Sequence, residues 1–142
     1  MKKFILMFCL FGLSLSALAR DDVSDYSVEK AMAVQKVSAA IGEGVKFYFA
    51  GQKHSKVIVN FGEFQSNRKT SAFGKSDTQA CQWAFASAMK ALQQKAVQNG
   101  ANAVINIKSN YKGNLTSSSS TFKCGAGAMV AGVTLVGDVV KL

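Results

Sequence analysis

The stretch that decides the fold is SDTQACQWAFASAMKALQQKAVQNGANAVINI, which covers residues 76–107. Ser76 and Gln79 have the spacing of a capping box, and Asp77 places a negative charge at the positive end of a helix dipole. Apolar side chains then recur at helical spacing and form one face; they are Cys81, Phe85, Ala88, Leu92 and Ala96. An Asn-Gly pair after Gln98 supplies a stop signal. The pattern therefore predicts a helix from Asp77 to Gln98.

Trp83 points away from this apolar face. At about 100° per residue it falls on the opposite side of the helix, near Ala86, Lys90 and Val97. A second layer of the protein would bury Trp83, and without such a layer it would be exposed beside lysine. Because tryptophan is enriched at binding surfaces, Trp83 is a candidate contact residue.

Two strand-like runs precede the helix. Residues 45–49 and 57–62 alternate large apolar side chains with others, which is typical of strands. The polar residues 51–55 join the two runs, so the pattern predicts an antiparallel hairpin. Residues 65–75 are rich in Ser, Asn, Lys and Thr, and we expect them to form a polar loop.

The flanking segments complete the pattern. Residues 28–39 predict a short amphipathic helix that ends before Gly42. Residues 103–107 predict a strand entering the core, and residues 110–121 predict a flexible loop or hairpin tip. Residues 122–141 are apolar and glycine-rich, which indicates two strand passes or one long bent strand with bulges.

These elements together predict an α+β fold. We expect a small antiparallel or mixed β-sheet packed on one long helix, with a short N-terminal helix in front. Residues 20–43 would form an N-terminal segment with the short helix, and residues 44–142 would form a single α+β domain.

Residues 1–19 have the layout of a secretory signal peptide. Lys2 and Lys3 supply positive charge, an apolar run extends from Phe4 to Leu15, and small residues end the segment at Ala19. The apolar run is shorter than the roughly 20 residues that a spanning helix needs. We therefore expect cleavage after Ala19 and a periplasmic location.

Two cysteines follow the predicted cleavage site, Cys81 in the helix and Cys124 in the last apolar stretch. An even number of cysteines in an exported chain predicts a disulfide bond, which would join the helix to the sheet. The alternative is a metal or redox pair, although CxxC spacing is absent and His54 is the one histidine in the sequence.

The chain is basic, with 17 Lys and Arg against 8 Asp and Glu. Without Lys2 and Lys3 the net charge is +7, because 15 basic residues then face 8 acidic ones. Such a protein attracts anionic surfaces or acidic proteins, although a solvated basic surface is the simpler alternative. The candidate binding surface, assigned to two neighbouring loops and the helix, comprises Lys53, His54, Lys56, Arg68, Lys69, Lys75 and Trp83.

Motifs for catalysis and nucleotide binding are incomplete. Gly74-Lys75-Ser76 matches the end of a P-loop, but Lys69 occupies the position of its first glycine. The carboxylates are scattered singly, and no nucleophile elbow is present. We therefore expect no enzymatic activity, no cofactor and no metal site, and neither nucleotides nor nucleic acids as partners.

The sequence from residue 45 to residue 142 resembles a group of small exported proteobacterial proteins labelled as excinuclease ATPase subunit-like. The matching stretches are residues 45–49, 80–85, 99–104 and 122–128. More distantly, the helix followed by Gly-Ala-Asn-Ala-Val resembles YbjQ-like domains and the signalling domain of the Rcs outer-membrane stress-sensor lipoprotein. Cys124 matches the cysteine of that sensor's last strand, whereas Cys81 has no clear counterpart there.

This resemblance implies a small disulfide-stabilised α+β domain that contacts other proteins. We therefore expect a non-enzymatic periplasmic binding or signalling-type domain, of the kind found in envelope stress responses. Its partners would be envelope proteins or anionic envelope surfaces. The alternative is a periplasmic protein that binds a small ligand or a metal.

Overall fold

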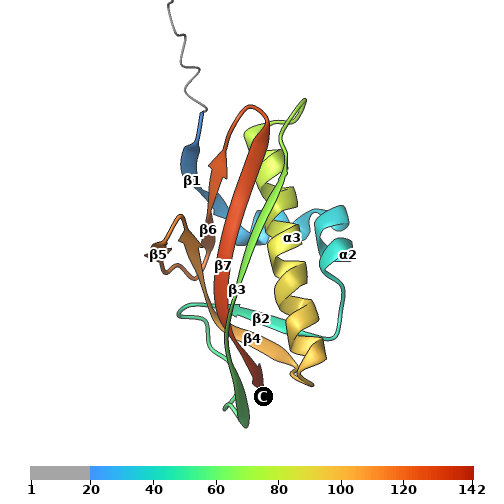
Figure 1. Cartoon of the computed structure of the whole chain (residues 1–142). Helices are drawn as coiled ribbons and strands as arrows, with labels where there is room; N and C mark the ends of the chain where they lie inside the picture. The colour runs from blue at the N-terminus through green and yellow to red at the C-terminus, as the bar shows by residue number, and fades with distance from the viewer. Residues whose placement is uncertain (1–19) are drawn as a thin grey trace, which may run out of the picture.

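The computed structural model describes residues 20–142, so the predicted signal peptide of residues 1–19 lies outside the described residues. The elements in chain order are β1 (Asp22–Ser27), α1 (Val28–Ala33), α2 (Gln35–Ile41), β2 (Lys46–Phe49), β3 (Val59–Ser71), α3 (Asp77–Gln98), β4 (Ala103–Tyr111), β5 (Asn114–Thr116), β6 (Thr121–Ala126) and β7 (Val130–Lys141). These elements form one mixed sheet packed on the long helix α3 (Figure 1). The predicted α+β class is confirmed.

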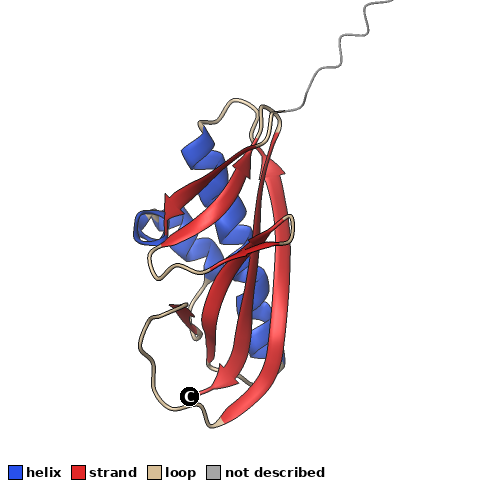
Figure 2. Cartoon of the chain, turned by 90° about the vertical axis from the view of Figure 1, so that its left-hand side faces the viewer, coloured by secondary structure: helices blue, strands red, loops and turns tan. Residues whose placement is uncertain are grey.

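β7 is the central strand of the sheet. β3 pairs with β7 in antiparallel fashion along its whole length, from Val59 opposite Lys141 to Ser71 opposite Val130. On its other side β7 pairs with β6 near its start and with β4 towards its end. β1 pairs with β6 in antiparallel orientation, and β2 pairs with β4 in parallel orientation. The curled sheet therefore has two arms, one formed by β6 and β1 and the other by β4 and β2 (Figure 2).

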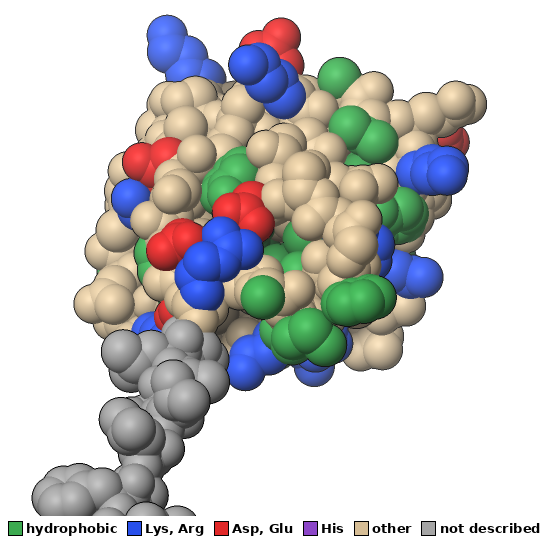
Figure 3. All heavy atoms as spheres, turned by 90° about the horizontal axis from the view of Figure 1, so that it is seen from above, with side chains coloured by type: hydrophobic (Ala, Val, Ile, Leu, Met, Phe, Trp, Pro, Cys, Tyr) green, Lys and Arg blue, Asp and Glu red, His purple; other side chains and the backbone are tan. Residues whose placement is uncertain are grey.

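The long strands and α3 connect two ends of the molecule. The amino end holds Arg20, residues 72–76 and the turn of residues 127–129, and Figure 3 looks onto it. The carboxyl end holds residues 53–58 and the C-terminal Leu142. β3 has 13 residues, and at about 3.3 Å per residue it separates the two ends by roughly 40 Å.

Helix α3 has the predicted bounds, Asp77–Gln98. The Ser76 side chain accepts a hydrogen bond from the backbone N–H of Gln79 at 3.1 Å, which completes the expected N-cap. The five residues of the predicted apolar face are all buried; they are Cys81, Phe85, Ala88, Leu92 and Ala96. The helix therefore covers one face of the sheet, and the core lies between them.

An aromatic column runs through this core. Phe85 of α3 stacks on Phe122 of β6, with 4.4 Å between ring centroids, and on Phe49 of β2 at 6.3 Å. Tyr26 of β1 also stacks on Phe122, with 5.9 Å between ring centroids. Because these rings come from both arms of the sheet and from α3, Phe85 and Phe122 join the arms to the helix.

The predicted disulfide between Cys81 and Cys124 is present. The two Cα atoms are 5.9 Å apart, and the bond connects α3 to β6. Both cysteines are completely buried. The expectation that the bond joins the helix to the sheet is therefore confirmed.

The predicted hairpin of residues 45–49 and 57–62 is wrong. β2 pairs in parallel with β4, with Lys46 opposite Ala103, and β3 pairs with β7 instead. Alternation identifies a strand but not its partner. β3 gains a much longer antiparallel partner in β7, while β2 inserts Phe49 into the core at the edge of the other arm.

The predicted polar loop of residues 65–75 is also wrong, because β3 continues to Ser71. β3 is an edge strand whose inner face lies under α3 and whose outer face is solvated. Ser66 is buried, and its hydroxyl donates to the carbonyl oxygen of Ala88 at 2.9 Å. Phe64 lies under the ammonium group of Lys95. The helix thus provides a hydrogen-bond partner for a buried polar side chain of a segment whose sequence predicts a loop.

The predicted helix of residues 28–39 is two helices, α1 and α2, with a break at Val34. The strand β1 before them was not expected. Its sequence DVSDYS is polar and lacks a strand pattern, but all six residues pair with β6. The segment of residues 20–43 therefore shares the sheet and the core with residues 44–142.

The strands that come after α3 in the chain agree more closely with the prediction. Residues 103–107 form a strand that extends to Tyr111, residues 110–121 contain the β4–β5 hairpin, and residues 122–141 make two passes. Gly125 and Gly132 face each other in these two passes, beneath Tyr111. A Cβ atom at Gly125 would collide with the Tyr111 hydroxyl, so the glycines make room for this ring.

Candidate functional site

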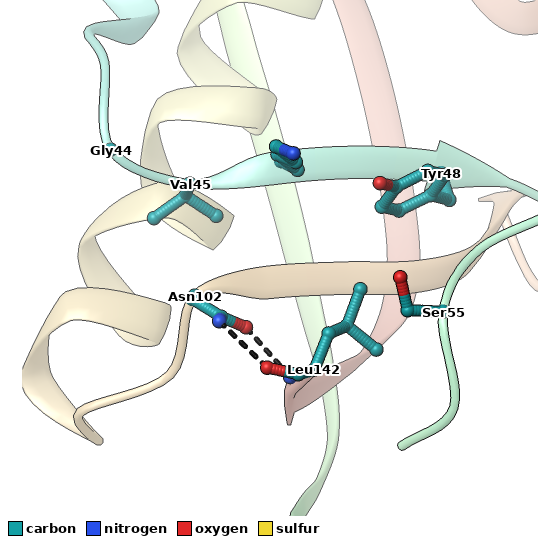
Figure 4. A pocket seen from close by; sticks show the side chains of 7 residues that line it. Gly44, Val45, Tyr48, Ser55, Asn102 and Leu142 are labelled. Carbon is teal, nitrogen blue, oxygen red and sulfur yellow. Dashed lines mark hydrogen bonds between the residues drawn. The ribbon is translucent and has the colours of Figure 1, made fainter. Parts of the chain in front are cut away.

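An open cavity of about 380 Å³ lies at the carboxyl end, beside β2 and the C-terminus (Figure 4). Its lining residues are Gly44, Val45, Lys46, Tyr48, Ser55, Asn102 and Leu142. Lys46 and Tyr48 occupy alternate positions of β2, so both side chains lie on the face of the strand that Phe49 does not occupy. An ammonium group and two hydroxyl groups therefore border one cavity.

The C-terminal residue is held in place by Asn102. The side-chain amide of Asn102 donates to the carbonyl oxygen of Leu142 at 3.1 Å, and its side-chain oxygen accepts from the Leu142 N–H at 2.8 Å (Figure 4). Leu142 thereby forms a fixed wall of the cavity. No local sequence pattern indicates this pair of hydrogen bonds, because Asn102 and Leu142 are brought together by the β4–β7 pairing.

Three predicted site residues, Lys53, His54 and Lys56, lie on the connection from β2 to β3 at this same end, and all three are exposed. The His54 ring packs against Tyr48, with 5.6 Å between ring centroids, and its Nδ1 lies 2.8 Å from the Ser55 carbonyl oxygen. With Lys46 these residues form what we call the carboxyl-end basic group: Lys46, Lys53, His54 and Lys56.

The remaining predicted site residues do not join this group. Arg68 and Lys69 lie on β3 rather than on a loop, and Lys75 precedes α3 at the amino end. The expectation that the basic candidates occupy two neighbouring loops is therefore wrong. Trp83 packs against the core and is half-buried. It is therefore neither fully covered by a second layer nor fully exposed.

Ion pairs within residues 20–142 are concentrated around the acidic N-terminal strand. Arg20 binds Asp22 and Asp77, with N–O distances of 2.9 Å. Asp21 accepts from Lys112, and Asp25 from Lys123. The hydrogen bond from Lys112, followed by that from Tyr111, holds the pKa of Asp21 below its ordinary value. The carboxyl-end basic group belongs to none of these ion pairs, so its charge is available to a partner.

Tyr111 should titrate at unusually high pH. Burial, with its hydrogen bond to Asp21, raises the pKa of Tyr111 to about 12. Because the folded-state pKa lies above the unfolded value of about 10, this contribution to stability is complete below pH ~10. It is lost as the pH rises through the folded-state pKa.

Absorbance titration of tyrosinate should therefore show a tyrosine with a pKa near 12, and Tyr111→Phe should remove that transition. The same variant should weaken the loss of stability in alkali, which chemical denaturation measures. An ordinary pKa for Tyr111 in the folded protein would contradict the hydrogen bond to Asp21.

Two further features bear on the kind of site. Within residues 20–142 no three His, Cys, Asp or Glu side chains gather in a group that could hold a metal ion. Over the same residues, no helix has both the length and the apolar character needed to cross a membrane.

In comparisons with known proteins, no family model, curated protein or solved structure matches the chain.

Proposed function

We propose that the chain is an exported, non-enzymatic binding domain whose carboxyl end contacts an anionic component of the cell envelope. The observation that carries this proposal is the carboxyl-end basic group beside an open cavity. Its four side chains are exposed and take no part in the ion pairs formed among residues 20–142. Exposed cations around a concave surface attract anionic partners over several ångströms and orient them.

Several observations support a location in an oxidising compartment such as the periplasm. The Cys81–Cys124 bond is of the kind that persists outside the cytosol. The leader pattern of residues 1–19 adds to this proposal, with cleavage after Ala19. The resemblance to exported proteobacterial proteins and to the Rcs sensor domain favours an envelope protein as the anionic partner.

Matched charge reversal tests the proposal. In Lys53→Glu/Lys56→Glu the carboxyl-end basic group loses two cations, and retention on immobilised envelope proteins from which detergent has removed the lipid should fall by at least tenfold. The control Lys36→Glu/Lys90→Glu changes the net charge equally at exposed positions on α2 and α3, and should retain binding. Equal retention of both variants, or an equal loss of retention in both, would contradict the proposal.

A small anionic ligand is the second candidate function, and the cavity itself favours it. Its volume of about 380 Å³ lies within the range typical of small-ligand sites. Titration with inorganic phosphate, followed by NMR, should shift the Lys46 and Tyr48 amides in this case. Unchanged amide signals in this region would remove a small anion as the ligand.

A further inference from the structure

The amino end carries a second surface, distinct from the cavity. The loop after β3 and the turn between β6 and β7 are joined there by a hydrogen bond from the Ala72 N–H to the Met129 carbonyl oxygen, at 2.9 Å. The two connections therefore project together from the same end of the sheet. Arg20 lies beside them, because its carbonyl oxygen would contact a Cβ atom at Gly127.

Three large apolar side chains are exposed at this end, two on the connections and one at the start of β7. Phe73 is 72% exposed, Met129 is 62% exposed and Val130 is 47% exposed, whereas the flanking Ala72 and Ala131 are buried. We call Phe73, Met129 and Val130 the apolar tip. Figure 3 shows hydrophobic side chains gathered at this end of the molecule with Lys and Arg side chains next to them.

The charges around the apolar tip are predominantly positive. Arg68 and Lys69 lie near the end of β3, and Lys75 donates to the Ser71 carbonyl oxygen at 3.0 Å. Three carboxylates also lie at this end: those of Asp22 and Asp77 are bound to Arg20, and that of Asp21 is bound to Lys112. The apolar tip thus projects from a surface with three further cations.

We infer that the apolar tip docks on an anionic lipid bilayer. Apolar side chains that enter the boundary between headgroups and acyl chains, next to basic side chains that bind anionic headgroups, are the two components of peripheral membrane binding. Each Lys or Arg near an anionic surface adds to this attraction. The positive charge around the apolar tip therefore complements the surface of an anionic bilayer.

A second copy of the chain fits less well, because three side chains provide far less than the roughly 800 Å² per partner of a stable interface.

Vesicle co-sedimentation tests the inference directly, with protein comprising residues 20–142. Binding to phosphatidylcholine vesicles that contain phosphatidylglycerol should exceed binding to phosphatidylcholine alone. Phe73→Ser/Met129→Ser should lower the partition coefficient at least tenfold, and Arg68→Glu/Lys69→Glu should remove the preference for the anionic lipid. Ile58→Ser is the matched control, since Ile58 is also 72% exposed but lies at the carboxyl end.

Three results would overturn the inference. These are no binding of the unmodified protein to anionic vesicles, equal binding by the Phe73→Ser/Met129→Ser variant, and a concentration-dependent dimer that this variant abolishes in sedimentation velocity. That the protein meets an envelope membrane in the cell rests on the proposed export. The vesicle assay itself does not involve the carboxyl-end basic group. Lys53→Glu/Lys56→Glu should bind vesicles normally, so the two proposals fail separately.

Discussion

Replacing Cys81 and Cys124 together by alanine is expected to lower the free energy of unfolding by about 2–5 kcal/mol. The bond closes a loop between residues 43 positions apart, for which the chain-entropy model gives roughly 4 kcal/mol. Both cysteines are also completely buried at the contact of α3 with β6. The variant therefore loses the covalent constraint that holds α3 against β6.

Urea denaturation with and without reductant measures this effect. Reductant should destabilise the unmodified protein and leave the Cys81→Ala/Cys124→Ala variant unchanged. Since the loss is a large fraction of the 5–15 kcal/mol typical of a domain, the melting temperature should fall by many degrees. Identical unfolding curves for oxidised and reduced protein would contradict the structural role assigned to the bond.

Phe85→Ala is expected to cost about 3–5 kcal/mol. Phe85 is completely buried and stacks on both Phe122 and Phe49, so truncation leaves a cavity at the centre of the aromatic column. The surrounding rings come from β2 and β6, which the sheet pairing holds apart, and they cannot close that space fully. The same denaturation experiment measures the loss.

Phe73→Ala provides the control within the same chain. Phe73 is 72% exposed, so its truncation should change stability by less than about 0.5 kcal/mol. Because Cys81 lies one helical turn before Phe85, combining Phe85→Ala with loss of the disulfide should give a non-additive result. Equal effects of the two phenylalanine substitutions would show that the aromatic column does not support the core.

The fold was predictable where local signals coincide. In α3 the cap at Ser76, the apolar face and the Asn-Gly stop all agree, and the helix has the bounds they predict. β1 and the second half of β3 could not be found in the same way. Their polar residues become strand residues through pairing with β6 and β7 and through contacts with α3, which no local pattern records.

The candidate site was predictable only in part. Composition and loop position single out Lys53, His54 and Lys56, which lie on the connection that contributes Ser55 to the cavity lining, although none of the three lines the cavity itself. Lys46 and Tyr48 were visible as alternate residues of a strand, but their role depends on β2 lying at the edge next to β4. Sequence reasoning placed Arg68 and Lys69 on a loop near them, and the length of β3 separates them instead.

Photocrosslinking from position 53, in intact cells that express the full chain, would identify the component that the carboxyl-end basic group contacts. Mass spectrometry of the crosslinked protein reports its partner, its first residue and the state of its cysteines. We expect a chain that begins at Arg20, an intact Cys81–Cys124 bond, and a crosslink to an anionic envelope component. A chain that retains residues 1–19, with both thiols free and crosslinks only to cytosolic proteins, would contradict it.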